Sequence, residues 1–402
     1  MGNSVGYHAW QSGGVSIAGV RYRYATKPGA FAHGAVDPAQ LLLAQYGRVS
    51  AGDTVVQLNC GNGLFGAVAA TTGQASRVLL SDRNIVSYGA AVRTLEANGA
   101  GSATVWLGNG TRMLPSEIPA DVVAIRIPHE KMALLQLMSD AWRALRVGGR
   151  CVIAGATNEG AKSAARLMEL LFGASQPLAS ERGFRVVSAV KQSDVAPMLK
   201  VFANPLLDYD VFNRVDAELR GMPVTLFTRP GVFSWEHLDE ATEILAAQML
   251  VDSGADVLDL GCGSGGLGIV AGRLSATGRI TMVDADSEAV RSAERSASAA
   301  GLAHFQTATS DIAEAVRNER FDVVVSNPPF HVGKATALNV PMQFMRDAFD
   351  VLRPGGRLFL VANRTLPYET ALSDIFGNMR TVHNGQRFKV LSATRSSRRE
   401  VE

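Results

Sequence analysis

The residues Asn327, Pro328, Pro329 and Phe330 are the most specific chemical signal in the chain, and they follow an apolar run at 321–325. Proline fixes φ and has no backbone N–H, so a rigid loop should present the Asn327 amide oxygen and the Pro328 carbonyl oxygen as acceptors. Two acceptors can hold a planar amine by its hydrogens and direct its lone pair at an electrophilic methyl group. Phe330 offers a face on which a base can stack. We predict all four as catalytic residues, although the same pattern is also typical of a simple turn that ends a strand.

A glycine-rich turn earlier in the chain predicts a ligand site. Its residues are Asp259, Gly261, Cys262, Gly263 and Gly265. The turn follows a predicted strand and opens a predicted helix, where glycine permits a sharp turn and close approach of a ligand. The pattern also fits the dinucleotide fingerprint, so an NAD enzyme and a turn without a ligand are alternatives. Asp259 favours a cationic ligand, such as a sulfonium amino acid, over a pyrophosphate.

Polar residues after the next two predicted strands extend this site. Asp284 ends a strand about 20 residues after the turn, a spacing that suits a carboxylate bound to ribose hydroxyls. Ala285 follows it and is included in the predicted site. Ser310 and Asp311 follow the third strand and are candidates for binding an adenine amine.

The chain carries this set of patterns twice. Cys60 matches Cys262, and Asp82 matches Asp284, each at a separation of 202 residues. Further matches in the same order, up to the Gly-Gly-Arg segments at 148–150 and 355–357, indicate a duplicated domain. The first copy has Arg126 in place of Asn327, and arginine has no acceptor. It also has Gln57 in place of Asp259, so we expect a degenerate copy without catalytic activity.

The predicted elements must position these residues in an α/β fold. Short apolar runs at 256–260, 280–283, 321–325 and 357–362 alternate with helical patterns such as 287–300. This alternation predicts two tandem Rossmann-like domains, each a doubly wound, mostly parallel sheet. We expect a degenerate domain at 1–190, a connecting segment at 191–225 and a catalytic domain at 226–402.

Together these residues resemble the bacterial ribosomal RNA guanine-N2 methyltransferases, namely methyltransferase C of the small ribosomal subunit and methyltransferase G of the large one, which are class I methyltransferases. The resemblance rests on the tandem domains, the segment 227–234 and the segment 327–333, and is strongest over 226–362. It implies that Asn327 and the Pro328 carbonyl hold a guanine amine on which Phe330 stacks. It also implies that S-adenosylmethionine is bound at this site, with the cofactor contacts at Gly261, Gly263, Asp284, Asp311 and Phe233. The first copy would then serve structure and substrate recognition.

Composition and net charge restrict how the protein could attract RNA. The 402 residues are 47% hydrophobic and 19% charged, and the net charge is only +2, so RNA must be attracted by local basic residues. The candidates for RNA contact are Arg21, Arg23, Lys27, Arg229 and Lys334. Three cysteines suffice neither for a disulfide framework nor for a four-ligand zinc site, so we expect no metal.

The expected partner is ribosomal RNA or a ribosomal subunit, with no membrane, and the expected location is the cytoplasm, since no signal or spanning segment is recognised. Alternatives remain open. The acceptor amine could be adenine N6 or a protein glutamine amide, because Asn-Pro-Pro segments suit planar amines in general. A non-catalytic RNA-binding protein is a further alternative.

Overall fold

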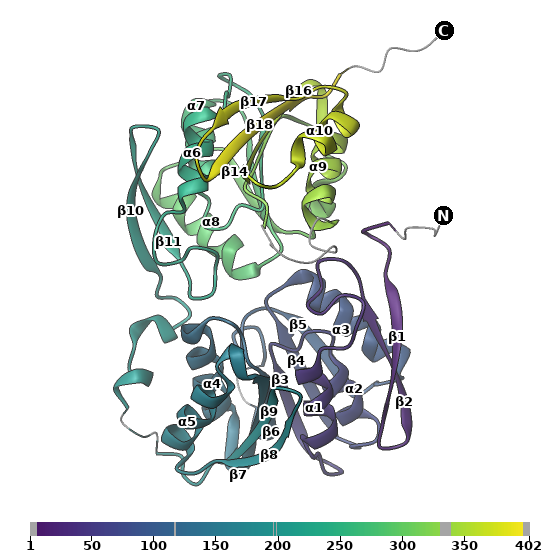
Figure 1. Cartoon of the computed structure of the whole chain (residues 1–402). Helices are drawn as coiled ribbons and strands as arrows, with labels where there is room; N and C mark the ends of the chain where they lie inside the picture. Colours follow the sequence, from purple (N-terminus) through teal and green to yellow (C-terminus); the bar gives the residue numbers. More distant parts are fainter. Residues whose placement is uncertain (1–5, 116–117, 196, 198, 330–338, 397–402) are drawn as a thin grey trace. The chain divides into compact units, whose positions relative to one another are not determined.

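The computed structural model describes residues 6–115, 118–195, 197, 199–329 and 339–396 (Figure 1). The chain forms two compact units, Met1–Val211 and Phe212–Glu402. The division falls inside the segment 191–225 that the sequence suggested as a connection. No described helix is long and apolar enough to cross a membrane.

Each unit begins with a hairpin and a helix. In the first unit these are β1 (Gln11–Ile17), β2 (Val20–Thr26) and α1 (Pro38–Tyr46). In the second they are β10 (Asn213–Leu219), β11 (Met222–Thr228) and α6 (Glu240–Gln248). The hairpins correspond residue by residue, since Gln11 pairs with Thr26 in the first and Asn213 with Thr228 in the second. The duplication therefore includes a hairpin that lies largely within 191–225, and we propose that only the residues before β10 connect the copies.

The first unit continues with a seven-stranded sheet in the order β5-β4-β3-β6-β7-β9-β8. Its strands are β3 (Thr54–Leu58), β4 (Arg77–Asp82), β5 (Ala103–Leu107), β6 (Ala120–Arg126), β7 (Leu145–Ala156), β8 (Gln176–Glu181) and β9 (Phe184–Val190). Its helices are α2 (Leu64–Ala70), α3 (Ile85–Ala97), α4 (Lys131–Ala144) and α5 (Ala161–Phe172), with short 3-10 turns at Thr157–Glu159, Lys200–Phe202 and Pro205–Leu207.

The second unit repeats this sheet in the order β14-β13-β12-β15-β16-β18-β17. Its strands are β12 (Val257–Leu260), β13 (Ile280–Asp284), β14 (Phe305–Thr309), β15 (Phe321–Ser326), β16 (Leu352–Asn363), β17 (Arg380–Asn384) and β18 (Phe388–Thr394). Its helices are α7 (Gly266–Leu274), α8 (Ser287–Ala299), α9 (Asn339–Val351) and α10 (Tyr368–Phe376), with a 3-10 turn at Glu314–Val316. In each sheet the first five strands in spatial order are parallel, and the sixth, β9 or β18, pairs antiparallel with both of its neighbours, which confirms the predicted fold class.

Alternate residues of the buried strands pack into cores on opposite faces of the sheet. In the first unit, Val55 joins a core with residues of α1, α2 and α3, whereas Val56 joins a core with residues of α4 and α5. In the second unit, Val257 packs with residues of α6, α7 and α8. Strand order reverses between β12 and β15, and such a switch point leaves a crevice at the carboxyl ends of the strands. The glycine-rich turn and Asn327 both lie at this edge.

Candidate functional site

The turn between β12 and α7 is built from glycines in the left-handed region. Gly261, Gly263 and Gly265 have φ values of 79°, 52° and 86°. A Cβ at Gly265 would lie 3.0 Å from the Ala293 backbone, so the turn can pack this closely only with glycine. A Cβ at Gly263 would meet nothing within 4 Å, so this position faces open space.

Asp284 braces this turn from the end of β13. Its Oδ2 accepts a hydrogen bond from the Gly263 N–H at 2.9 Å, and its Oδ1 accepts one from the Asp286 N–H at 3.0 Å. The first copy keeps the contact, because the Gly61 N–H donates to Asp82 Oδ2 at 2.9 Å. The carboxylate predicted to bind ribose therefore lies directly beside the glycine turn.

Asp259 supports the turn from inside the protein. It is fully buried, and its Oδ2 accepts a hydrogen bond from the Gly268 N–H at 2.8 Å. Its Oδ1 is buried with no hydrogen-bond partner among the described residues. Burial, with a smaller contribution from the Asp284 charge, raises the pKa of Asp259 to about 7. The first copy makes the same contact without a charge, since Gln57 Oε1 accepts from the Gly66 N–H at 3.0 Å.

We expect Asp259→Asn to stabilise the cofactor-free protein at pH 8 and to change its stability little at pH 4. A carboxyl with a raised folded pKa contributes its full stability below its ordinary pKa and loses it as pH rises toward 7. The shift from 3.8 to about 7 corresponds to at most about 4 kcal/mol. Urea unfolding across pH 4–8 measures the difference.

Gln57→Glu is the converse control, because it places a titratable carboxyl at the matching buried position and should destabilise the first unit as pH rises. An unchanged pH dependence in Asp259→Asn would contradict the assignment of the buried charge to Asp259.

A cavity opens where the glycine turn, the segment before α6 and the end of β15 meet. Its lining includes Gly261, Cys262, Gly263, Phe233, Thr242 and Asn327, together with Asp239. The Ser326 hydroxyl donates to the Leu260 carbonyl oxygen at 2.7 Å and ties the ends of β15 and β12 together. The sequence-predicted Asn327 therefore lies beside the predicted cofactor turn.

The Asn327 amide is held by two acceptors at the start of α6. Its Nδ2 donates to Asp239 Oδ2 at 2.9 Å and to Thr242 Oγ1 at 3.0 Å. Pro328 is buried and Pro329 is exposed. Phe330 and Lys334 lie outside the described residues.

Sequence reasoning did not identify Asp239 and Thr242. The available signal was the repeat itself, because Asp37 in the first copy precedes α1 as Asp239 precedes α6.

The other predicted cofactor residues line the same edge with different exposure. Ser310 follows β14 and is almost fully buried, and its N–H donates to the Asp284 carbonyl oxygen at 2.8 Å. Ala285 and Asp311 are half-buried. Phe233 lines the cavity and is 65% exposed. Cys262 is buried, and this burial raises the pKa of its thiol.

The four described cations that were predicted to contact RNA divide into an exposed pair and a buried pair. Arg21 and Arg23 are exposed on β2. Lys27 is 2% exposed and lies over the Tyr7 ring at 4.5 Å. Arg229 is 1% exposed and its Nε lies 3.2 Å from Glu288 Oε2. The burial of Lys27 and Arg229 argues against the expected phosphate contact, because both cations pack inside their unit.

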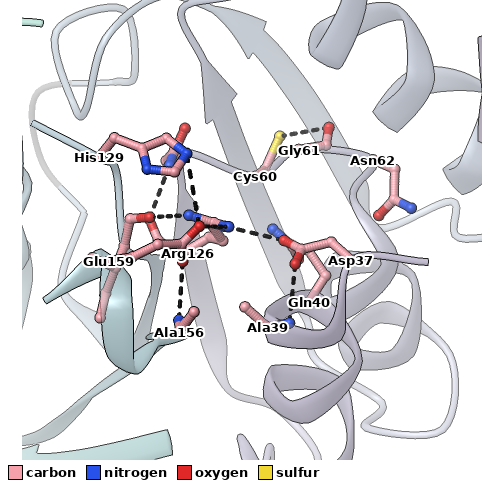
Figure 2. A network of polar contacts seen from close by, with 12 residues as sticks. Asp37, Ala39, Gln40, Cys60, Gly61, Asn62, Arg126, His129, Ala156 and Glu159 are labelled. Atoms are coloured by element: carbon pink, nitrogen blue, oxygen red, sulfur yellow. Dashed lines mark hydrogen bonds and ion pairs between the residues drawn. The ribbon is translucent and has the colours of Figure 1, made fainter. Parts of the chain in front are cut away.

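The first copy has a buried ion-pair network at the position of the catalytic loop. Figure 2 shows the Arg126 guanidinium between the carboxylates of Asp37 and Glu159. Its Nε lies 3.1 Å from Asp37 Oδ2, and its terminal nitrogen Nη2 lies 2.7 Å from Glu159 Oε1. The Phe31 ring covers the guanidinium at 4.2 Å. Cation donors therefore replace the amide acceptor that an amine substrate needs.

Comparisons with known proteins show similarity to methyltransferases. The family description "Methyltransferase small domain" matches residues 21–188 and 223–392. The small-subunit ribosomal RNA methyltransferase C of Hahella chejuensis is 32% identical over 70% of this chain and 80% of its own length. The large-subunit ribosomal RNA methyltransferase G of Vibrio atlanticus is 27% identical over 83% of this chain and 84% of its own.

A solved structure is similar along almost the whole chain. It is the T. thermophilus 16S rRNA N2 G1207 methyltransferase in complex with AdoMet and guanosine, with a TM-score of 0.80 and 29% identity. The match covers 97% of this chain and 98% of the other. The described residues contain no group of three or more His, Cys, Asp or Glu able to hold a metal ion.

Proposed function

This chain belongs to the methyltransferase small-domain family, and from that premise we propose that it transfers a methyl group from S-adenosylmethionine to the N2 amine of a guanosine in ribosomal RNA. The observation that carries the proposal is the position of Asn327. Its amide lies in one cavity wall with Gly261 and Gly263, directly after a strand that ends beside the glycine turn. A methyl donor on the turn and an amine on the loop would therefore meet.

The residues of the second unit fit the cofactor. Gly263 leaves space that a side chain would fill, and the Asp284 carboxylate is held at the neighbouring strand end. We propose that Gly261, Cys262, Gly263 and Phe233 contact the amino-acid part. Asp284 and Ala285 would contact the ribose, and Ser310 and Asp311 would lie at the adenine. Asp259 and Gly265 shape the turn that these contacts require.

The chain's own residues supply positioning. Asn327 Oδ1 and the Pro328 carbonyl oxygen accept the two hydrogens of the N2 amine and aim its lone pair along the direction of attack. S-adenosylmethionine supplies a methyl group on a sulfonium sulfur, which leaves as a neutral thioether. The nitrogen forms the new bond to the methyl carbon while the sulfur keeps the electron pair of the broken bond. The amine then loses one proton to water.

The product identifies the substrate class. Incubation with methyl-labelled S-adenosylmethionine and unmodified ribosomal RNA, followed by digestion to nucleosides, should yield labelled N2-methylguanosine. Naked RNA and assembled ribosomal subunits, offered in parallel, would show which form is used. Label in N6-methyladenosine or in protein glutamine would overturn the guanine assignment. We place this reaction in the cytoplasm as part of the same proposal.

A further inference from the structure

We propose that Asp239 and Thr242 are positioning residues that orient the Asn327 amide for methyl transfer. The inference rests on the proposed function and adds two residues to its site. The amide group of Asn327 has a donor end and an acceptor end of nearly the same shape, and only the acceptor end can bind an amine hydrogen. Something must therefore determine which end faces the substrate.

The start of α6 places the carboxylate. Asp239 is the N-cap of α6, and its Oδ2 accepts the Thr242 N–H at 2.9 Å and the Thr242 hydroxyl at 3.2 Å. The same Oδ2 accepts from Asn327 Nδ2 at 2.9 Å. A helix cap thus holds the oxygen rigidly where the loop after β15 begins, and a bond to an ionised acceptor is roughly twice as strong as a neutral one.

The Asp239 carboxylate selects one orientation of the amide. A carboxylate can only accept, so the reversed amide would lose the hydrogen bond to Asp239 and bring Asn327 Oδ1 against Asp239 Oδ2, two acceptor oxygens. With Nδ2 directed at α6, Oδ1 is left for the substrate amine. No hydrogen bond from another described residue to Asn327 Oδ1 competes for it. The cap therefore pre-orients the acceptor before the base arrives.

The first copy keeps the capping carboxylate but lacks the asparagine amide that this carboxylate would orient. Asp37 caps α1 and contacts Arg126, the residue that replaces Asn327. The position of Thr242 is taken there by Gln40, whose amide bonds to Gln57. The capping carboxylate is shared by both copies, whereas the hydroxyl that completes the amide contact is present only where Asn327 is.

The test separates orientation from helix capping. In Asp239→Ser/Thr242→Val, serine still caps the helix but is too short to hold the amide, and valine removes the hydroxyl without changing the shape. We expect kcat for N2-methylguanosine formation to fall about 10- to 100-fold. The affinity for S-adenosylmethionine and the KM for RNA should stay within about threefold of wild type.

Two further variants complete the experiment. Asp239→Asn keeps an acceptor oxygen at the cap and should recover most of the lost kcat. Glu130→Ser replaces the capping carboxylate of α4 in the first unit, which is not among the residues that line the cavity, and should leave kcat unchanged.

A double variant with kcat within twofold of wild type would overturn the inference. Weakened cofactor affinity with an unchanged kcat would overturn it too, because the residues would then be cofactor ligands. Absence of N2-methylguanosine from the wild-type reaction would instead refute the proposed function.

Discussion

Asn327→Ala is expected to lower kcat for methyl transfer by about 100- to 1000-fold, the cost of removing one preorganised polar group from an active site. In the proposed reaction the side chain holds the amine, and alanine would leave only the backbone acceptor of Pro328. Because the amide does not shape the glycine turn, affinity for S-adenosylmethionine should change little. Steady-state kinetics with ribosomal RNA and a cofactor titration measure the two quantities separately.

Asn378→Ala is the matched control. Asn378 lies in the same unit between α10 and β17, where its Nδ2 donates to the Phe376 and Thr394 carbonyl oxygens. It does not line the cavity, so its loss should leave kcat near the wild-type value. A fully active Asn327→Ala protein would show that the amide does not hold the substrate.

Arg126→Met is expected to destabilise the first unit by about 3–5 kcal/mol at pH 7. The substitution leaves the carboxylates of Asp37 and Glu159 without their cation, and both side chains are under 10% exposed. Removing one partner of a buried ion pair costs this much because the remaining charge stays out of water. Urea unfolding followed by tryptophan fluorescence reports mainly on this unit, which holds Trp10, Trp106 and Trp142.

The loss should shrink as the pH falls below 4.5, the ordinary pKa of glutamate. Burial alone would raise the pKa of Glu159, but the hydrogen bonds from Arg126 and the Ala156 N–H, together with the charges of Arg126 and His129, hold the pKa below its ordinary value. A lowered folded pKa contributes stability above the ordinary pKa of glutamate and loses it in acid, so wild type loses more than the variant.

Asp37→Asn and Glu159→Gln, added to Arg126→Met, should recover stability by removing the unpaired charges. A pH-independent loss in the single variant would mean that packing rather than charge is responsible.

The glycine-rich turn and the position of the Asn-Pro-Pro segment directly after a strand were predictable because local backbone chemistry determines them. Glycine adopts positive φ values, such as those at Gly261, Gly263 and Gly265, without steric cost. Proline restricts φ in any loop that contains it. The duplication was also readable, since matched residues recur at a constant spacing. The doubly wound sheet followed from the alternation of apolar runs and helical patterns and is confirmed in both units.

Only the tertiary structure decided which residues meet across long stretches of chain. Asp239 reaches Asn327 across 88 residues, and a helix cap in the sequence does not reveal what its carboxylate will contact. The sequence also did not indicate which cations would be buried. Lys27 and Arg229 look like exposed cations in the sequence, but aromatic rings and Glu288 surround them once the hairpins fold against α3 and α8. Local conformational preference is a property of the residue itself, whereas solvent exposure and contact depend on every element packed around it.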